Sequence, residues 1–470
     1  MRMDATNVAA IALAFRPVAK AAGREPAGRD GPAGRCPGAV NEALPIGDEF
    51  ENIDSASVSF PSVIGKIKYG VSVQLRYSFR LYPTPGQRMA LARAFGCARV
   101  VFNDALAARQ AAYVAGEPYI TDTAMSARLT ACKDTPGRAW LSEVSSVVLQ
   151  QALADLNAAY RNFFASATGK RIGARIAPPR FRSRKDSRQA IRFTANARFR
   201  VLDNGKLRLP KVGDVPVQWS RALPAAPSSV TVIRDAAGRF FASFVVQARR
   251  EPLPATGREC GIDLGLGHFA VLDDGTKVTA PRFLRRAEKK LKKAQRDLSR
   301  KQKGSANREK ARVKVARAHA RVKDARRDFH HKLSMRIIRE NQAVTVEDLA
   351  VKGLARTRMA KPVHDAGWSA FTGMLEYKAR LYGREFRRIG RFEPTSQMCS
   401  ACGVRDGPKP LHVREWECRA CGTVHDRDVN AAKNIAALGR RDALKARGGQ
   451  VRPAATLAPA SETGSRRGAA

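Results

Sequence analysis

Acidic residues are scarce in this chain of 470 residues, where 42 Asp and Glu face 85 Lys and Arg, a formal net charge of +43. A surplus of this size repels itself unless a polyanion neutralises it, so the composition favours nucleic acid as a partner. The surplus is unevenly placed, because residues 1–70 contain 8 basic and 8 acidic side chains. The cationic surface must therefore be built from the rest of the chain.

Long apolar runs and closely spaced cysteines are also missing. The sequence has no uninterrupted run of roughly 18 apolar residues and no compact basic amphipathic segment, so we expect no membrane partner. Its 8 cysteines comprise two C-x-x-C pairs and four scattered singly, at Cys36, Cys97, Cys132 and Cys260. That spacing is not typical of a secreted disulfide scaffold and favours a reducing cytoplasm.

The two ends of the chain show little periodicity. Residues 8–15, VAAIALAF, form a short apolar run, but no convincing signal-peptide cleavage site follows it. A stretch rich in Pro, Gly, Ala and Arg comes next and predicts disorder. We expect residues 1–72 to be a disordered extension, either translated from a start codon assigned too early or present as a genuine tail. Residues 443–470 are expected to form a second disordered tail.

Regular structure is predicted to begin near residue 75. Apolar and polar residues alternate over 75–81, which predicts a strand, and Thr84 and Pro85 then begin a helix as N-cap and first helical residue. Helical periodicity continues to about residue 166. Strands follow over 190–250, where SVTVIRD and RFFASFVVQ predict a hairpin, and a linker at 251–257 leads to a new unit.

Residues 282–339 predict a helical hairpin with a strong positive charge. Two heptad-patterned helices are separated by a turn at Gly304 and Ser305, and they hold 23 Lys and Arg against 5 Asp and Glu. A solvated charged face is the alternative, but this bias exceeds what salt bridges within the hairpin would need. We expect phosphate contacts from Lys289, Lys290, Lys292 and Lys293, and from Arg180 and Arg182 in the basic segment PPRFRSR.

Two predicted apolar strands carry acids, one in the middle of its strand and one at the end. Asp263 lies in the strand at 260–264, where an ionised carboxylate is costly without a cation, although an Asp beside a Gly-rich turn can also be structural. Ribonuclease-H-like nucleases place their first metal ligand on such a strand. Glu347 ends the strand at 343–346 and is the second candidate ligand, whereas we assign Asp348 to capping the next helix.

A third acidic site lies in HDRDVNAAKNI, where Asp426 and Asp428 precede an apolar helix. One of them can cap the helix while the other faces the site. Three carboxylates from separate segments could hold two Mg²⁺ ions roughly 3.5–4 Å apart, which would activate water and stabilise the leaving oxygen in phosphodiester cleavage.

The paired cysteines carry the sharpest metal signal. Cys399 and Cys402 are followed, after 15 intervening residues, by Cys418 and Cys421, a spacing that predicts a four-thiolate zinc ribbon. Such a site is closed, so its Zn²⁺ is structural. His412 and His425 lie nearby, but four cysteines already satisfy the ion.

The order of these motifs resembles the TnpB (OrfB) proteins of bacterial insertion sequences. The resemblance covers residues 74–440 and rests on GIDLGLG, VTVEDLAVKGL, WSAFTGMLEYKARLYG, SQMCSACG and CRACGTVHDRDVNAAKNI. The opening YSFRLYPTPGQRMALARAFGCARVVFNDAL and the segment PPRFRSR are similar to the family as well.

The resemblance implies an α/β multidomain protein with a RuvC-like (ribonuclease-H-like) nuclease domain carrying a zinc-ribbon insertion. It further implies a β-rich wedge domain at 73–84 and 170–255 and a helical recognition domain at 85–169. The split nuclease domain would span 258–395 and 426–442, and the zinc ribbon 396–425. The RuvC acids carried over are Asp263, Glu347 and Asp428, with Asp428 preferred to Asp426 because the family's ligand lies two residues before the Asn of DVNAA.

Members of the family are RNA-guided DNA endonucleases related to compact type V CRISPR effectors. The resemblance therefore implies a transposon-encoded enzyme that cleaves double-stranded DNA beside a short flanking motif, using a guide RNA transcribed from its own element, in the bacterial cytoplasm at the nucleoid. A companion transposase from the same element stays open as a partner. The alternatives are an RNA-guided repressor that does not cut and an accessory transposase without cleavage, and the three intact acids weigh against the repressor.

Overall fold

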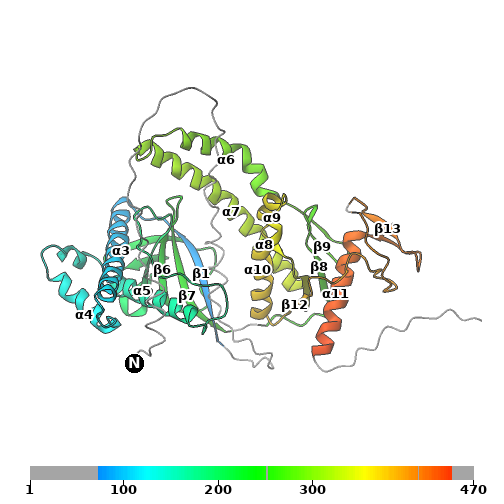
Figure 1. The fold of residues 1–470 in the computed structure, drawn as a ribbon, viewed down its shortest axis with the longest axis horizontal. Coiled ribbons are helices and arrows are strands. Elements are labelled where there is room, and N and C mark those ends of the chain that lie inside the picture. The colour runs from blue at the N-terminus through cyan, green and yellow to red at the C-terminus, as the bar shows by residue number, and fades with distance from the viewer. Residues whose placement is uncertain (1–71, 250–251, 411, 447–470) are drawn as a thin grey trace, which may run out of the picture. The chain divides into compact units, whose positions relative to one another are not determined.

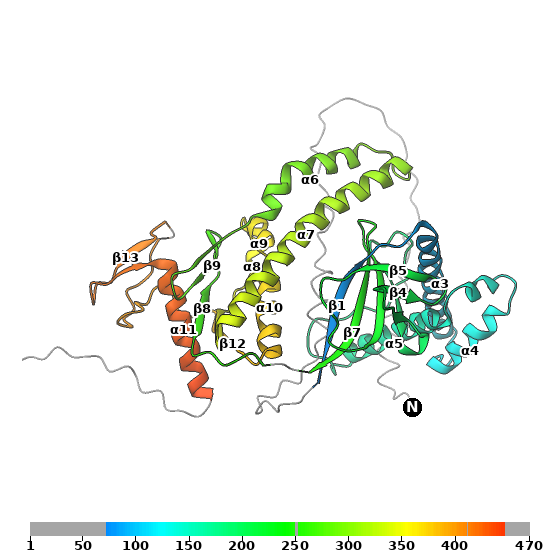
Figure 2. The ribbon, with the colours of Figure 1, turned by 180° about the vertical axis from the view of Figure 1, so that it is seen from behind.

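The computed structural model describes residues 72–249, 252–410 and 412–446. The predicted N-terminal extension, except Ser72 at the start of the first strand, and most of the predicted C-terminal tail therefore lie outside the described residues. The chain divides after Arg249 into two compact units (Figures 1 and 2). None of the helices in the described residues is long and apolar enough to cross a membrane.

The first unit is built on a seven-stranded sheet in the order β2-β6-β7-β1-β5-β4-β3. The predicted strand near residue 75 is β1, which pairs antiparallel with β7 along its whole length, and the predicted hairpin is formed by β6 and β7. Its strands are β1 (Ser72–Leu81), β2 (Gln189–Thr194), β3 (Arg200–Val201), β4 (Lys206–Leu209), β5 (Gly213–Gln218), β6 (Pro227–Arg234) and β7 (Phe240–Arg249).

Three helices of the first unit share its hydrophobic core with the sheet. They are α3 (Pro85–Val114), α4 (Asp122–Lys133) and α5 (Ser146–Ala167), accompanied by the short 3-10 turns η2 (Ala139–Glu143) and η3 (Ala195–Ala197). The predicted start of α3 is confirmed, because Thr84 and Gln87 form a reciprocal capping box and Pro85 is the first helical residue.

The second unit contains a five-stranded mixed sheet in the order β10-β9-β8-β11-β12. Strands β8, β11 and β12 are parallel, whereas β9 and β10 continue as an antiparallel meander from β8. This order and these directions define a ribonuclease-H-like sheet, so the predicted fold class is confirmed. The strands are β8 (Glu259–Asp263), β9 (His268–Leu272), β10 (Lys277–Thr279), β11 (Ala343–Glu347) and β12 (Glu385–Ile389).

Helices cover both faces of this sheet. Successive side chains of a strand point to opposite faces, and on β11 Val344 and Val346 join the core formed with α7 (Ala306–Glu340) and α10 (Trp368–Leu381). Thr345 lies between them and meets Gly439 of α11 (Arg427–Ala446) on the other side. Two short helices, α8 (Val351–Leu354) and α9 (Ala360–Ala366), connect β11 to α10.

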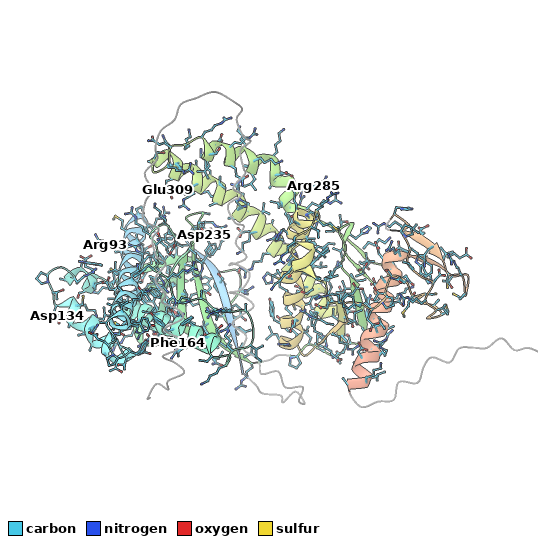
Figure 3. All side chains as sticks on the ribbon, in the orientation of Figure 1. Arg93, Asp134, Phe164, Asp235, Arg285 and Glu309 are labelled. Carbon is cyan, nitrogen blue, oxygen red and sulfur yellow. The ribbon has the colours of Figure 1, made fainter. Side chains whose placement is uncertain are left out.

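The predicted helical hairpin is formed by α6 (Phe283–Ser299) and α7. Gly304 adopts a φ of 88° in the turn and the Ser305 side chain caps α7, so both residues have the predicted role. The amides of Leu284 and Arg285 at the start of α6 are capped by the carboxylate of Asp365, at 2.7 and 3.1 Å. Figure 3 shows Arg285 at the base of this hairpin and Glu309 near its turn.

A small two-stranded ribbon precedes the last helix. Strands β13 (Glu415–Glu417) and β14 (Val424–Asp426) pair antiparallel, and α11 begins at the next residue. This helix continues to Ala446, so residues 443–446, which we expected in the C-terminal tail, are helical. Ala443 and Lys445 are good helix formers, and they extend a helix that is already packed on the sheet.

Candidate functional site

Asp263 and Glu347 lie side by side at one edge of the ribonuclease-H-like sheet. Each is the last residue of its strand, and the parallel register that pairs Ile262 with Val346 brings the two acids level with each other. Neighbouring strands are roughly 4.8 Å apart. Asp263 is thus at the end of its strand rather than in the middle, where the sequence suggested it would be, and this position opens it toward the sheet edge.

Helix α11 supplies the third acid, Asp428, from its first turn. The helix approaches β8 very closely at Gly261, where a β-carbon would lie 2.6 Å from the backbone nitrogen of Ala436. Only glycine allows that approach. The close packing of α11 on β8 therefore sets the distance between Asp428 and the two strand acids.

The three acids form an anionic cluster whose charge is only partly compensated. Burial, Glu347 and Asp428 together raise the pKa of Asp263 to about 7, against a smaller opposing effect of Arg427 and Arg414. Burial also raises the pKa of Glu347, although the Thr395 hydroxyl donates to its Oε1 at 2.5 Å and opposes that rise. Asp263 is thus the acid whose pKa is raised by both of the others.

The acids adjacent in sequence to the site have structural partners instead. Asp426 caps α11, accepting from the amides of Asp428 and Val429, and its other oxygen pairs with Lys277 at 2.5 Å. Of the predicted division of roles, the capping by Asp426 is therefore seen, and the ligand role of Asp428 stays a prediction. The capping role predicted for Asp348 is wrong, because α8 has Ala350 as its N-cap with no side-chain cap.

Asp348 instead pairs with Arg391 at 2.7 Å across the sheet edge, a long-range partner that its position before a helix does not reveal. Among the described residues, no Lys or Arg forms an ion pair with Asp263 or Glu347, and Asp428 has one, Arg414 at 3.3 Å. The cluster is therefore short of positive charge, and oxygen ligands of this kind suit Mg²⁺. Among the described residues, only the four cysteines have ligand atoms close enough together to hold one metal ion. The oxygens of the three acids are farther apart than that.

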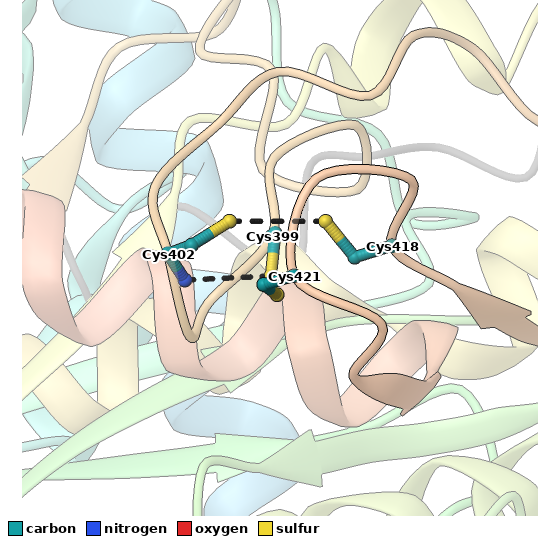
Figure 4. Close-up of side chains that lie close together, drawn as sticks. All are labelled: Cys399, Cys402, Cys418 and Cys421. Atoms are coloured by element: carbon teal, nitrogen blue, oxygen red, sulfur yellow. Dashed lines mark hydrogen bonds between the residues drawn. The ribbon is translucent and has the colours of Figure 1, made fainter. Parts of the chain in front are cut away.

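The four cysteines Cys399, Cys402, Cys418 and Cys421 converge, with all their sulfurs within 4.8 Å of one another (Figure 4). The Cys399–Cys421 and Cys402–Cys418 sulfur pairs are each separated by 3.7 Å. A tetrahedral thiolate site with Zn–S bonds of about 2.3 Å has edges of about 3.8 Å. The sulfurs are placed to bind a single metal ion and suit Zn²⁺.

Two tight turns of the same kind hold the cysteine pairs. In each turn the glycine after the second cysteine has positive φ and donates its amide to the first cysteine's carbonyl, at 2.9 Å for Gly403 and 2.8 Å for Gly422. His425 stays outside the sulfur set and places its Nε2 3.0 Å from the sulfur of Cys399, as an N–H donor to a thiolate would. His412 is exposed on the surface and is not among the four ligands.

Comparison with known proteins gives the family. A profile of the OrfB proteins described as "Probable transposase" matches residues 243–358, and one described as "Cas12f1-like, TNB domain" matches residues 368–435. The chain is 47% identical over 385 residues to a "Putative RNA-guided DNA endonuclease" of Streptomyces pristinaespiralis, covering 81% of this chain and 92% of that protein. The chain belongs to the TnpB (OrfB) family.

Another TnpB relative, the "Putative RNA-guided DNA endonuclease InsQ" of Escherichia coli (strain K12), is 30% identical over 380 residues, covering 77% of this chain and 92% of its own. Among solved structures, the protein of a cryo-EM Cas12f1-sgRNA-target DNA complex is similar over 78% of this chain and 99% of its own. The identity is 12% and the TM-score 0.46, so this likeness says nothing about the activity of this chain. A "Helix-turn-helix domain" profile matches residues 72–117, where this TnpB protein forms β1 and the single long helix α3.

The residues predicted to contact nucleic acid in this TnpB protein differ in their surroundings. Lys289, Lys290 and Lys293 of α6 are exposed and have no ion-pair partner among the described residues, whereas Lys292 pairs with Glu288 at 2.8 Å. In the first unit Arg180 is exposed. The guanidinium of Arg182, by contrast, stacks over the Phe102 ring at 3.8 Å and pairs with Asp155 at 3.2 Å, so its charge is partly neutralised within the fold.

Three residues that position the site were missed from the sequence. Thr395 bonds to Glu347, Gly261 admits α11, and Gly439 lies against Thr345. Thr395 belongs to the TSQMCSACG segment, but nothing local indicates that its hydroxyl reaches an acid 48 residues earlier. The two glycines stand in a strand and a helix, where an isolated glycine suggests close backbone approach without identifying the neighbour.

Proposed function

We propose that this TnpB protein is an RNA-guided DNA endonuclease, encoded by an insertion sequence and cleaving double-stranded DNA beside a short flanking motif. The guide would be an RNA transcribed from its own element. The printed names of its relatives at 47% and 30% identity support the activity. The observation that carries the proposal is the placement of the acids: Asp263 and Glu347 end neighbouring parallel strands, and Asp428 lies in the first turn of the helix packed on them.

Asp263, Glu347 and Asp428 would hold Mg²⁺ in this proposal. A bound pair of Mg²⁺ ions supplies the charge that activates a water molecule and stabilises the leaving oxygen of a phosphodiester. Asp263 would be central to that set of acids, because both other acids raise its pKa. Thr395 fixes the rotamer of Glu347 through its hydrogen bond, and Asp426 fixes the first turn of α11, so that Asp428 enters the cluster from a rigid helix end.

The four cysteines would hold a structural Zn²⁺. Among the described residues, the ribbon returns the chain through β14 directly into the cap of α11. Zinc therefore supports the position of Asp428 without supplying a catalytic group. The wedge role of residues 73–84 and 170–255, the recognition role of 85–169 and the nuclease role of 258–395 and 426–442 are part of the same proposal.

Guided binding without cutting is the alternative function. A protein that only represses would have no need for three clustered carboxylates, since each raises the cost of ionising the next. No observation on the described chain favours that alternative. In a guided enzyme, base pairing with the guide RNA selects the target sequence, so the protein mainly contacts the nucleic-acid backbone. Cationic residues spread over a long hairpin fit that role.

Plasmid cleavage tests the proposal. Protein co-expressed with RNA from its own locus is incubated with a plasmid carrying the guide-matched site behind a randomised flank, in Mg²⁺ and in EDTA. We expect linear product that requires Mg²⁺, the guide match and Asp263, with the Asp263→Ala protein inactive. Asp134→Asn removes an exposed carboxylate from the end of α4 and should cut like the parent (Figure 3). Guide-matched binding without cutting would establish the repressor instead.

A further inference from the structure

The turn that follows β12 carries a large aromatic side chain fully into solvent beside the acid cluster. Phe392 is 93% exposed, and it has no ring or cation–π partner among the described residues. Ile389, three residues earlier, is the Cα partner of Glu347 in the sheet. The Cα of Phe392 is therefore at most about 11 Å from a residue paired with a proposed metal ligand.

This turn is fastened to the fold on both sides of Phe392. Before it, Arg391 binds the side chain of Asp348 at 2.7 Å and its carbonyl at 3.2 Å. After it, Glu393 pairs with Arg441 of α11 at 2.9 Å, and Thr395 donates to Glu347. An exposed phenyl ring on a loose loop needs no explanation. A ring held out by a turn with three anchors is a preorganised surface, because little conformational entropy remains to be lost when something covers it.

The surroundings identify what would cover the ring. Arg391 precedes it with its side chain 47% exposed, and Arg414, which reaches Asp428 in the acid cluster, has a side chain 62% exposed. Both arginines pair with an acid, so their charge is partly neutralised, but their exposed side chains can still contact the phosphate of a nucleotide whose base stacks on the ring. An apolar protein partner would gain nothing from these charges.

We infer that Phe392 is a stacking platform for an unpaired base of the DNA strand that enters the Asp263–Glu347–Asp428 cluster. The inference rests on the proposed nuclease function and adds a substrate-positioning residue to it. Stacking tolerates every base, so such a platform suits an enzyme whose cut position is set by a guide rather than by local sequence. Phe392 would hold the strand while the acids and their metal act on the adjacent phosphodiester.

Single-turnover cleavage of a guide-matched duplex provides the test. One stacked base contributes enough that Phe392→Ala should slow cutting about 5- to 100-fold. Guided binding in EDTA should change by less than about twofold, because pairing with the guide dominates it. Phe392→Trp preserves a stacking face and should retain the rate. Leu444, at the far end of α11, is another exposed apolar residue, with 51% of its surface exposed. Leu444→Ala should therefore cut at the parental rate.

Substrates with single abasic sites locate the contact. When the abasic site replaces the stacked base, the parent should cut as slowly as Phe392→Ala cuts the intact substrate, and Phe392→Ala should cut no more slowly than before. When the abasic site lies at any other position, the parent should still cut faster than Phe392→Ala. A 2-aminopurine placed there should be quenched in EDTA by the parent and not by Phe392→Ala. Cutting by Phe392→Ala at the parental rate, or an equal loss on all abasic substrates, would overturn the inference.

Two outcomes separate this inference from the function on which it rests. If the parent binds its guided target but does not cut, the nuclease proposal fails, and the 2-aminopurine measurement still decides whether Phe392 stacks a base. If Phe392→Ala lowers the melting temperature by several degrees without affecting quenching, the ring packs on another part of the protein and the platform is wrong.

Discussion

Gly439 offers the sharpest test of how the fold positions Asp428. A β-carbon at this position of α11 would lie 2.5 Å from Cγ2 of Thr345, and even nearer to its hydroxyl oxygen. Ordinary carbon contacts begin near 3.4 Å, so Gly439→Ala requires a displacement of about 0.9 Å. Thr345 is β-branched and 2% exposed, so it has little freedom to rotate away. The helix must therefore move away from the sheet.

This displacement should cost stability and activity together. Overpacking of this kind costs about 1–3 kcal/mol, which for a unit of this size lowers the melting temperature by about 2–12 °C. A shift of about 1 Å in a catalytic group can lower a rate by about 100-fold. We expect a loss of that order in single-turnover cleavage, with guided binding in EDTA preserved, because the guide-pairing surface is not altered.

Thr345→Ala should rescue the variant. It removes the hydroxyl and Cγ2 and leaves the β-carbon, 3.0 Å from the new methyl group, so the displacement falls to about 0.4 Å. Thermal unfolding and cleavage of the two single variants and the double variant form a cycle, and we expect the double variant to recover most of both losses. Gly373→Ala on α10, where nothing lies within 4 Å, is the control and should stabilise the protein slightly.

Additive losses in this cycle, or a Gly439→Ala protein that melts and cuts like its parent, would refute the reasoning. Either result would mean that α11 does not approach β11 closely enough for glycine to be required there. A variant that loses stability without losing activity would show instead that Asp428 is positioned from the start of the helix alone.

Three further predictions test the site and the basic hairpin. Asp263 holds its proton more tightly when folded, since its pKa of about 7 exceeds the unfolded value of about 3.9. The free energy of unfolding of the metal-free protein should therefore fall by up to a few kcal/mol between about pH 4 and 7, and Asp263→Asn should flatten that decline in melting scans made in EDTA. Cys418→Ser should release zinc and abolish cutting with all three acids present; full-rate cleavage would exclude the ribbon as a support. Replacing four lysines of α6 with alanine should weaken binding to all DNA sequences alike and reduce the slope of log affinity against log salt concentration by about 3–4. A sequence-selective loss would contradict phosphate contacts. The four positions are Lys289, Lys290, Lys292 and Lys293.

Features encoded by local spacing were predictable from the sequence. The four-cysteine cluster depends on two short turns, so its spacing alone predicts the converging sulfurs now seen. The strands of Asp263 and Glu347 are short apolar runs that end in an acid, and the α6–α7 hairpin shows heptads on both sides of a glycine turn. The capping box at Thr84 is likewise contained in four residues. In each case the determining contacts join residues close in the chain.

Contacts between distant segments could not be predicted in the same way. Asp348 looks like a cap because an acid before a helix usually is one, and only the sheet brings Arg391 to it. The true cap of α6 is Asp365, 80 residues further along the chain from the Arg285 amide it binds. Thr395 reaches Glu347 for the same reason: the turn after β12 folds over the end of β11. Packing between distant segments therefore decides which acids have a cationic partner and which do not.

The helix α11 connects these observations into one physical account of the site. Its first residue follows β14 of the cysteine ribbon, its cap Asp426 is held by Lys277 from β10, and its body is held against β8 and β11 by Gly261 and Gly439. Asp428 sits between the cap and the glycine contacts and has only one cationic partner of its own. Its position is therefore determined by the four-cysteine ribbon before the helix and by close packing further along it. This arrangement explains how a four-cysteine ribbon can lie directly before a candidate metal ligand: the ribbon fixes the chain where the first turn must begin, and the sheet fixes where the rest must lie.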